Sequence, residues 1–131
     1  MSKRASGTFE VKMTPMSPDE IGDPGVRRMV LEKQFHGDLE GTSKGQMLAV
    51  STDIEGSAGY VAIERVSGTL NSQNGTFVLQ HFGTMNRGTF ELNISVIPDS
   101  GTEQLTGLKG EMVIKITDGN HFYEFEYSLV P

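Results

Sequence analysis

Turn pairs that contain glycine, separated by runs of alternating apolar and polar residues, constrain this sequence most. Sixteen glycines occur among its 131 residues. Alternation with a period of two is typical of a half-buried β-strand, and no segment carries the apolar stripe of an amphipathic helix over a useful length. The pattern predicts eight strands, at residues 5–14, 27–39, 43–54, 59–71, 76–86, 89–98, 107–117 and 121–130. Residues 15–26 are expected to form a loop.

The pair Asp118-Gly119 predicts the register of the last hairpin. Both central positions of a type I′ turn need a positive φ, which this pair tolerates well. A turn centred there collects the apolar side chains on one face, and a slip of one residue would mix the two faces. The pairs on the apolar face are Ile116 with His121, Ile114 with Tyr123, Met112 with Phe125 and Gly110 with Tyr127. We therefore expect the Tyr127 ring to cover the bare backbone of Gly110.

Two further pairs predict the turns in the middle of the chain. Asn74-Gly75 predicts a hairpin between the strands 59–71 and 76–86, and Arg87-Gly88 predicts the next turn. Together they give three consecutive strands that share one continuous apolar surface. A slip of two residues at the first turn would keep the faces and change only the partners.

Glycines also lie inside the strands, on the apolar face, at positions 68, 83 and 110. Interior glycines suggest sharp coiling, as at the corners of a barrel. We therefore expect an all-β fold, a closed antiparallel meander barrel of about eight strands, in one domain over residues 1–131. A β-sandwich is the alternative. A barrel of this size is either filled by side chains or holds one small ligand.

Composition and charge exclude several classes of function. The chain has no cysteine, and hence no disulfide, thiolate nucleophile or cysteine metal site. Its net charge of −6 disfavours both nucleic acid, which selects a basic face, and an anionic membrane. No apolar segment resembles a signal peptide or a membrane span, so a cytoplasmic protein is expected.

Two polar residues, Glu64 and His81, interrupt the apolar face and are the candidate catalytic residues. One register makes them diagonal neighbours on adjacent strands, whereas a turn centred on Asn74-Gly75 places them four positions apart. A buried carboxylate beside an imidazole could act as an acid/base pair. The alternative is a satisfied polar pair that fixes the strand register.

Other side chains on the same face could touch a ligand in the barrel. They are Tyr60, Met85, His121, Tyr123 and Tyr127. A tyrosine could hydrogen-bond a ligand carbonyl, although buried tyrosines commonly bind protein groups instead. His36 and Asp38 share a face but have no third ligand at a fixed spacing, so we predict neither a metal site nor a cofactor.

Several blocks resemble an uncharacterised bacterial family of small domains of unknown function. The blocks are KQFHGDL at 33–39, GSAGYVA at 56–62, FVLQH at 77–81, VIPDSGT at 96–102 and GNHFYEF at 119–125. The resemblance implies a barrel like that of allene oxide cyclase and brings no established activity. The segment 100–110 is also similar to a glycine-rich stretch of allene oxide cyclases and dirigent proteins, with Glu103 in place of a glycine and Leu105 in place of the aromatic. No functional residue of the cyclases has a counterpart here, so their chemistry is only an analogy.

Three functions fit these observations. The first is a binding protein that holds a small, largely apolar molecule in the barrel. The second is a cofactor-free isomerase or cyclase that uses Glu64 and His81. The third is a filled barrel that serves only as a structural unit of a homo-oligomer, since outward-facing apolar residues suggest a subunit interface. These residues are Val61, Ile63, Val78 and Phe82.

Overall fold

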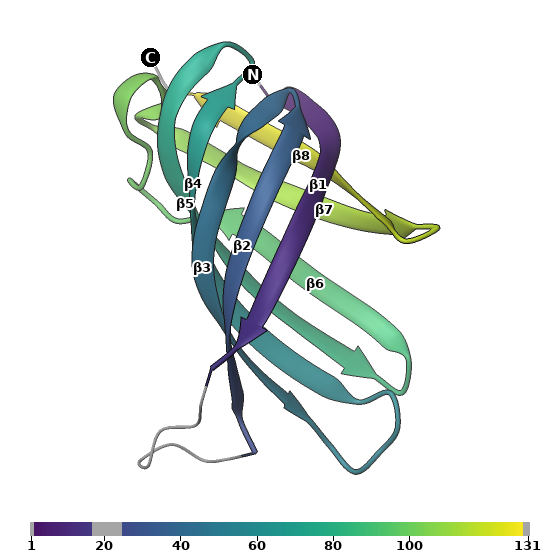
Figure 1. Cartoon of the computed structure of the whole chain (residues 1–131). Helices are drawn as coiled ribbons and strands as arrows, with labels where there is room; N and C mark the ends of the chain where they lie inside the picture. The colour runs from purple at the N-terminus through teal and green to yellow at the C-terminus, as the bar shows by residue number, and fades with distance from the viewer. Residues whose placement is uncertain (1, 17–24, 130–131) are drawn as a thin grey trace.

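A computed structural model of the chain describes residues 2–16 and 25–129, which form a closed antiparallel barrel (Figure 1). Each strand pairs with the next in the sequence, and β8 pairs with β1. The strands are β1 (Lys3–Pro15), β2 (Arg27–Gly37), β3 (Leu39–Ser51), β4 (Ala58–Leu70), β5 (Gln73–Asn86), β6 (Thr89–Val96), β7 (Leu108–Thr117) and β8 (Asn120–Leu129). One 3₁₀ turn, η1 (Glu103–Leu105), lies between β6 and β7. The predicted all-β meander barrel is confirmed.

The last two predicted turns are confirmed. Asp118 and Gly119 have φ values of 52° and 79°, and β7 pairs with β8 in the predicted register, with Gly110 opposite Tyr127. Arg87 and Gly88 also form the turn between β5 and β6. The ring that covers Gly110 is different from the one predicted: it is the ring edge of Phe125, beside the Cβ of Tyr127.

The prediction of a turn at Asn74-Gly75 is wrong. The chain turns at Asn71 and Ser72, which have φ values of 45° and 73°, and Asn74-Gly75 lies inside β5. The reason is tertiary. The segment between β6 and β7 packs over Gly75, where an added Cβ would lie 2.3 Å from the Thr102 carbonyl oxygen. Gly75 is therefore needed for a close approach of two chain segments and not for a turn.

The turn between β2 and β3 also differs from the prediction, because β2 ends at Gly37 and β3 begins at Leu39. Gly37 has a φ of 111°, which favours glycine. The Asp38 carboxylate accepts a hydrogen bond of 2.9 Å from the Ser6 amide on β1, so a side chain holds this tight turn against the neighbouring strand. Of the predicted loop 15–26, residues 17–24 lie outside the described residues.

The barrel is filled at one end. Aromatic and aliphatic side chains occupy this closed end, where the turns β2–β3 and β4–β5 meet. The largest fully buried ones are Tyr123, Tyr127, Phe35, Phe77, Phe125, Leu39, Leu70, Leu79, Leu105 and Leu108. Leu105, from η1, covers this end and packs on Gly75. Among the described residues, the space that these side chains leave in the lumen lies toward the opposite end.

At the opposite end the barrel splays between β6 and β7. These strands share one paired position, Ser95 with Glu111, whereas the other neighbouring strands pair over seven residues or more. The hairpin β5–β6 and the hairpin β7–β8 diverge from this point (Figure 1). In the described part of the chain, the lumen is therefore open at this end of the barrel and along this seam, where a cavity lies.

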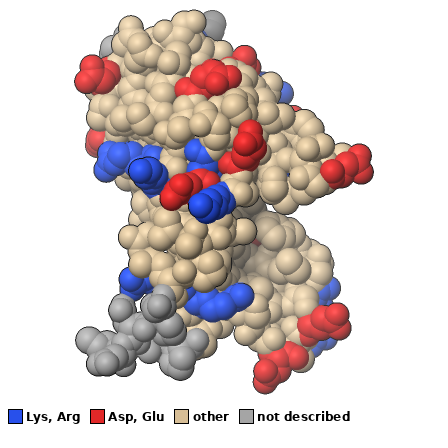
Figure 2. All heavy atoms as spheres, in the orientation of Figure 1, with Lys and Arg blue, Asp and Glu red and all other residues tan. Residues whose placement is uncertain are grey.

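The outer surface mixes charged and apolar areas. Basic side chains form a band across the middle of one face, with acidic ones among them and at the periphery (Figure 2). The register places Lys12, Glu32, Lys44 and Arg65 in one row on β1–β4. The second row further along the same face, on β3–β5, is apolar and consists of Leu48, Val61 and Phe82, all exposed. In the described parts of the chain, no helix is long and apolar enough to cross a membrane.

Candidate functional site

Four polar side chains meet inside the barrel, and each comes from a different strand. Glu64 on β4 is fully buried and accepts a hydrogen bond of 2.7 Å from Ser43 Oγ and one of 2.8 Å from Lys33 Nζ. His81 Nε2 on β5 lies 2.5 Å from Glu64 Oε2, but the pair is not aligned as a good hydrogen bond. We call Lys33, Ser43, Glu64 and His81 the polar cluster. It combines an ion pair with a histidine in contact with the carboxylate.

A glycine on β3, Gly45, lets the Glu64 side chain reach across that strand. Gly45 lies directly opposite Glu64, and a Cβ at Gly45 would come within 2.1 Å of the Ile63 carbonyl oxygen. The two backbones approach closely here, because no side chain stands between them. The carboxylate can therefore reach Ser43 on β3 and Lys33 on β2. Of the two arrangements of Glu64 and His81 that the sequence left open, the register produces the diagonal one, with Ala62 opposite His81 and Glu64 opposite Leu79.

The partners of Glu64 keep it ionised. Burial by itself raises the pKa of a carboxyl group. Here the close contact with His81 and the positive charge of Lys33 outweigh burial and lower the pKa of Glu64 to about 2. Burial, together with the nearby charge of Glu64, raises the pKa of Tyr60 to about 12, so its phenol stays neutral. Glu64 is therefore a poor general base near neutral pH, and Tyr60 is a neutral hydrogen-bonding group.

A cavity of about 340 Å³ lies above the polar cluster, at the open end of the barrel. Lys33, His81 and Tyr60 contribute to its wall, which is otherwise mainly aliphatic and thioether side chains. The apolar lining includes Val11, Leu31, Met13, Met29, Met47, Met85, Phe90, Leu92, Ile114 and Ile116. Among residues 2–16 and 25–129, no Asp or Glu side chain lines the cavity. Because Leu92 and Ile114 come from β6 and β7, the cavity extends to the open seam.

The structure places three of the five candidate ligand residues at this cavity. Tyr60, Met85 and His121 line it, and the His121 ring packs on Phe9 with centroids 5.1 Å apart. The Tyr60 ring lies over Gly83, where an added Cβ would meet it at 2.7 Å. His81 lines the cavity as well, and Glu64 lies beneath the wall.

Tyr123 and Tyr127 do not line the cavity, contrary to expectation. The Tyr123 hydroxyl accepts a hydrogen bond of 2.9 Å from the Leu39 amide and lies 3.0 Å from the His36 carbonyl oxygen. The Tyr127 hydroxyl accepts one of 2.6 Å from the Asn71 side chain. Both tyrosines thus hold turns at the closed end of the barrel, and burial raises the pKa of Tyr123.

Lys33 and Ser43 belong to the site but were missed by the sequence reasoning. Lys33 could have been predicted from the alternation along its strand, because it lies on the same inward face as Leu31 and Phe35. The inward positions of Glu64 and His81 were predicted by the same argument. Its ammonium also lies 5.1 Å from the centroid of the Phe9 ring, a cation–π contact. Ser43 carried no comparable signal, since a small polar residue among glycines predicts nothing about its partners.

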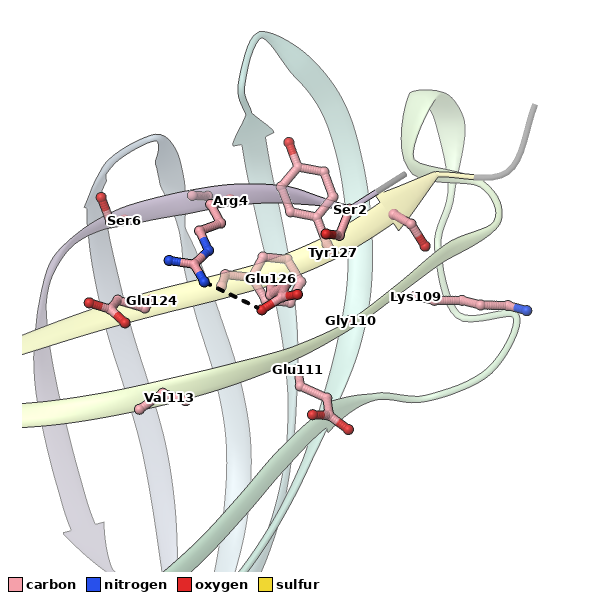
Figure 3. Close-up of a pocket in the computed structure, with 13 residues that line it drawn as sticks. Ser2, Arg4, Ser6, Lys109, Gly110, Glu111, Val113, Glu124, Glu126 and Tyr127 are labelled. Atoms are coloured by element: carbon pink, nitrogen blue, oxygen red, sulfur yellow. Dashed lines mark ion pairs between the residues drawn. The ribbon is translucent and has the colours of Figure 1, made fainter.

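A larger hollow, of about 510 Å³, lies on the outer side of β1, β7 and β8 (Figure 3). Its charged side chains point outward, and Arg4 pairs with Glu126 at 4.0 Å while both remain largely exposed. An exposed pair of this kind contributes little binding energy. This hollow is therefore a surface groove beside Gly110, and the chemically distinctive site is the cavity above the polar cluster.

His36 lies at the surface, with Nε2 3.0 Å from Glu10 Oε1. Asp38 holds the β2–β3 turn instead of sharing a site with it. Within residues 2–16 and 25–129, no three His, Cys, Asp or Glu side chains are arranged to hold a metal ion.

Comparison with known proteins places the chain in a family. A family model described as "Protein of unknown function (DUF3224)" matches residues 5–127. The chain belongs to the DUF3224 family. A crystal structure of a DUF3224 protein with unknown function from Shewanella oneidensis MR-1 is 48% identical to it, with a TM-score of 0.93, and the match covers 100% of this chain and 99% of that chain. A search of curated proteins gave no match.

The predicted membership of an uncharacterised bacterial family is thus confirmed, and the DUF3224 barrel is shared with a solved bacterial structure. The more specific likeness to allene oxide cyclase stays a prediction. Because the family carries no assigned activity, the function of this DUF3224 protein has to be argued from the cavity and the polar cluster.

Proposed function

We propose that this DUF3224 protein binds a small, largely apolar molecule in the open end of its barrel. The observation that carries the proposal is the cavity of about 340 Å³, which continues the lumen and has a mainly apolar wall. Its volume falls within the range of small-molecule sites, roughly 300–1,000 Å³. A few polar groups at the base of an apolar pocket are the usual arrangement for fixing the orientation of a ligand.

The composition of the wall supports a binding role over a barrel that is merely filled. Four methionines, Met13, Met29, Met47 and Met85, line the cavity. Methionine is flexible and polarizable, so such a wall can adapt to the shape of a ligand. The open seam between β6 and β7 gives a second route of access. A cytoplasmic location is part of the proposal and agrees with the lack of cysteine.

The test is a titration with N-phenyl-1-naphthylamine, a neutral probe whose fluorescence rises in apolar surroundings. The wild-type protein should bind it. Met47→Trp should weaken binding about tenfold or more, because the larger ring fills the cavity. Gln46→Trp is the matched control, since Gln46 is the neighbouring residue on β3 and faces solvent. A wild-type protein that leaves the probe dark, or equal binding by the Met47 variant, would contradict the proposal.

Native mass spectrometry of protein purified from its own host gives an independent test. A small molecule that co-purifies with the wild-type protein and is lost from the Met47→Trp variant would occupy the cavity. Co-purification that is unaffected by this variant would place the molecule elsewhere.

A cofactor-free isomerase or cyclase is the second candidate, favoured by the contact between His81 and Glu64. In this alternative, His81 would exchange the proton with the substrate, and the buried Glu64 carboxylate would orient the imidazole. Glu64 itself would not be the base, because its pKa is about 2 and it lies beneath the wall. A homo-oligomer that buries the outer row on β3–β5 is compatible with either activity.

A further inference from the structure

The charges around the cavity differ from those of the chain as a whole. The sequence carries 17 acidic and 11 basic residues, yet in the described part of the chain the charged residues of the cavity wall are Arg27 and Lys33, with no acid beside them. Two histidines, His81 and His121, also line the wall. The Glu64 carboxylate beneath is already engaged by Ser43 and Lys33. Among the residues that the structure describes, a negative ligand group would therefore meet donors and positive charge, and no exposed carboxylate.

The Lys33 ammonium has hydrogen-bond donors available for a ligand. A lysine ammonium can donate three hydrogen bonds, and among the described residues Lys33 donates one, to Glu64. Its nitrogen lies near the rings of both Phe9 and Phe35, 5.1 Å and 5.9 Å from their centroids, and the residue is buried, so little water reaches it. A hydrogen bond between charged groups is strong in such surroundings. The neutral Tyr60 hydroxyl on the same wall could donate another.

We propose that the ligand is an amphipathic anion, an apolar chain with a single carboxylate or similar oxyanion head. The head binds at Lys33 and His81, at the base of the cavity, and the chain runs along the methionines toward the seam between β6 and β7. This inference rests on the proposed binding function and adds the chemical class and orientation of the ligand. A cationic head would be repelled by Lys33, and a neutral head would gain no hydrogen bond between opposite charges from it.

Three probes with the same chain separate these possibilities: dodecanoate, 1-dodecanol and dodecyltrimethylammonium, each used to displace N-phenyl-1-naphthylamine from the wild-type protein. Dodecanoate should bind about 10- to 100-fold more tightly than dodecanol, the range expected for one charge-assisted hydrogen bond. The trimethylammonium compound should bind most weakly. Equal affinities would overturn the inference and leave the proposed function intact. If none of the three compounds displaced the naphthylamine, or the naphthylamine itself did not bind, the proposed function would fail.

A variant pair locates the head. Replacing Lys33 alone would leave Glu64 buried without its cation, so the variant is Lys33→Met combined with Glu64→Gln, which removes both charges. It should bind dodecanol as the wild type does and lose the preference for dodecanoate. Arg65→Met removes one positive charge from the outer face of β4 and should keep the preference. If Arg27→Met, at the rim, abolished the preference while the double variant kept it, the assigned position of the head would be wrong.

Discussion

Glu64 shows how strongly one residue depends on its surroundings. Removing a carboxylate from water is costly, and an ion pair repays that cost only when its hydrogen bonds are well placed. Here Lys33 and Ser43 lie within 2.8 Å of the two carboxylate oxygens. Replacing such a pair by apolar residues of the same volume is often neutral or stabilising. The pair is therefore weak evidence for stability and stronger evidence for a role of the cavity floor.

Glu64→Gln should destabilise the protein by about 3–5 kcal/mol at pH 7, because the variant leaves the Lys33 ammonium buried without a counter-ion. Urea unfolding of the wild type and the variant measures the difference. Lys33→Met combined with Glu64→Gln is the control and should recover much of the loss. A double variant as unstable as the single one would mean that the charge of Lys33 is not the cause.

The same pair predicts a dependence on pH. The pKa of Glu64 is lowered from 4.5 to about 2 in the folded protein, so its ionisation favours folding above about pH 4.5. That contribution is lost as the pH falls from about 4.5 toward 2. The stability difference between the wild type and Glu64→Gln should therefore shrink over this window. A difference that stayed constant from pH 6 to pH 2.5 would show that Glu64 titrates normally.

Strand glycines decide local structure at the scale of the elements. Gly45 lets β3 and β4 approach so that Glu64 can reach across, and Gly75 makes room for the segment that covers the closed end. Neither glycine has a positive φ, so turn chemistry does not explain them. The pair Asn74-Gly75 therefore did not mark a turn, because Gly75 serves packing. Strand glycines in this barrel are better interpreted as sites of close contact.

Gly110→Val should destabilise the protein by about 1–3 kcal/mol through overpacking. A Cβ at Gly110 would lie 2.7 Å from the Glu126 carbonyl oxygen and 2.9 Å from the Phe125 ring. The gain in β-propensity, within about 1 kcal/mol, is too small to compensate. Urea unfolding measures the effect, and Phe125→Leu should relieve part of it through coupling between neighbours.

Gly59→Val provides the matched control for Gly110→Val. Gly59 also lies in a strand, but an added Cβ would have its nearest neighbour at 3.7 Å, an ordinary contact. This variant should be neutral or slightly stabilising. If the two valine variants changed the free energy of unfolding equally, close packing at Gly110 would not explain the destabilisation by Gly110→Val.

At the scale of the whole molecule, the described residues form a barrel filled at one end and open at the other, with an apolar row on its outer face. Val78, expected to belong to that outer surface, is partly covered by the chain's own segment between β6 and β7: its amide donates to Ser100 Oγ, and its carbonyl accepts from Ile97. Leu48, Val61, Ile63 and Phe82 remain exposed. Contiguous exposed apolar side chains of this kind mark interaction surfaces.

We expect this surface to mediate self-association. Val61→Glu should shift the sedimentation coefficient at high micromolar concentration toward that of the monomer, because it places a charge in the middle of the apolar row. Val113→Glu is the control, since Val61 and Val113 are 51% and 53% exposed but lie on different parts of the barrel. A wild-type protein that sediments as a monomer would rule out the interface.

The sequence by itself determined the strands, most of their faces and the last hairpin. These features follow from alternation and turn chemistry, which act between neighbours in the chain. The inward positions of Glu64 and His81 follow from parity alone, which is the same in any register shifted by an even number of residues. The family could also be recognised from the sequence alone, because the resemblance rests on short local blocks of residues.

Only the tertiary structure decided which residues meet. The turn at Asn71 and Ser72, the contact of Lys33 with Glu64 and the separation of Tyr123 and Tyr127 from the cavity all depend on contacts between distant segments. Lys33 and Glu64 are 31 residues apart, on strands separated by β3. Closure of the barrel fixes which end the large side chains fill, and so where a cavity remains. Local patterns carry no information on that choice, because it is the packing of all eight strands that makes it.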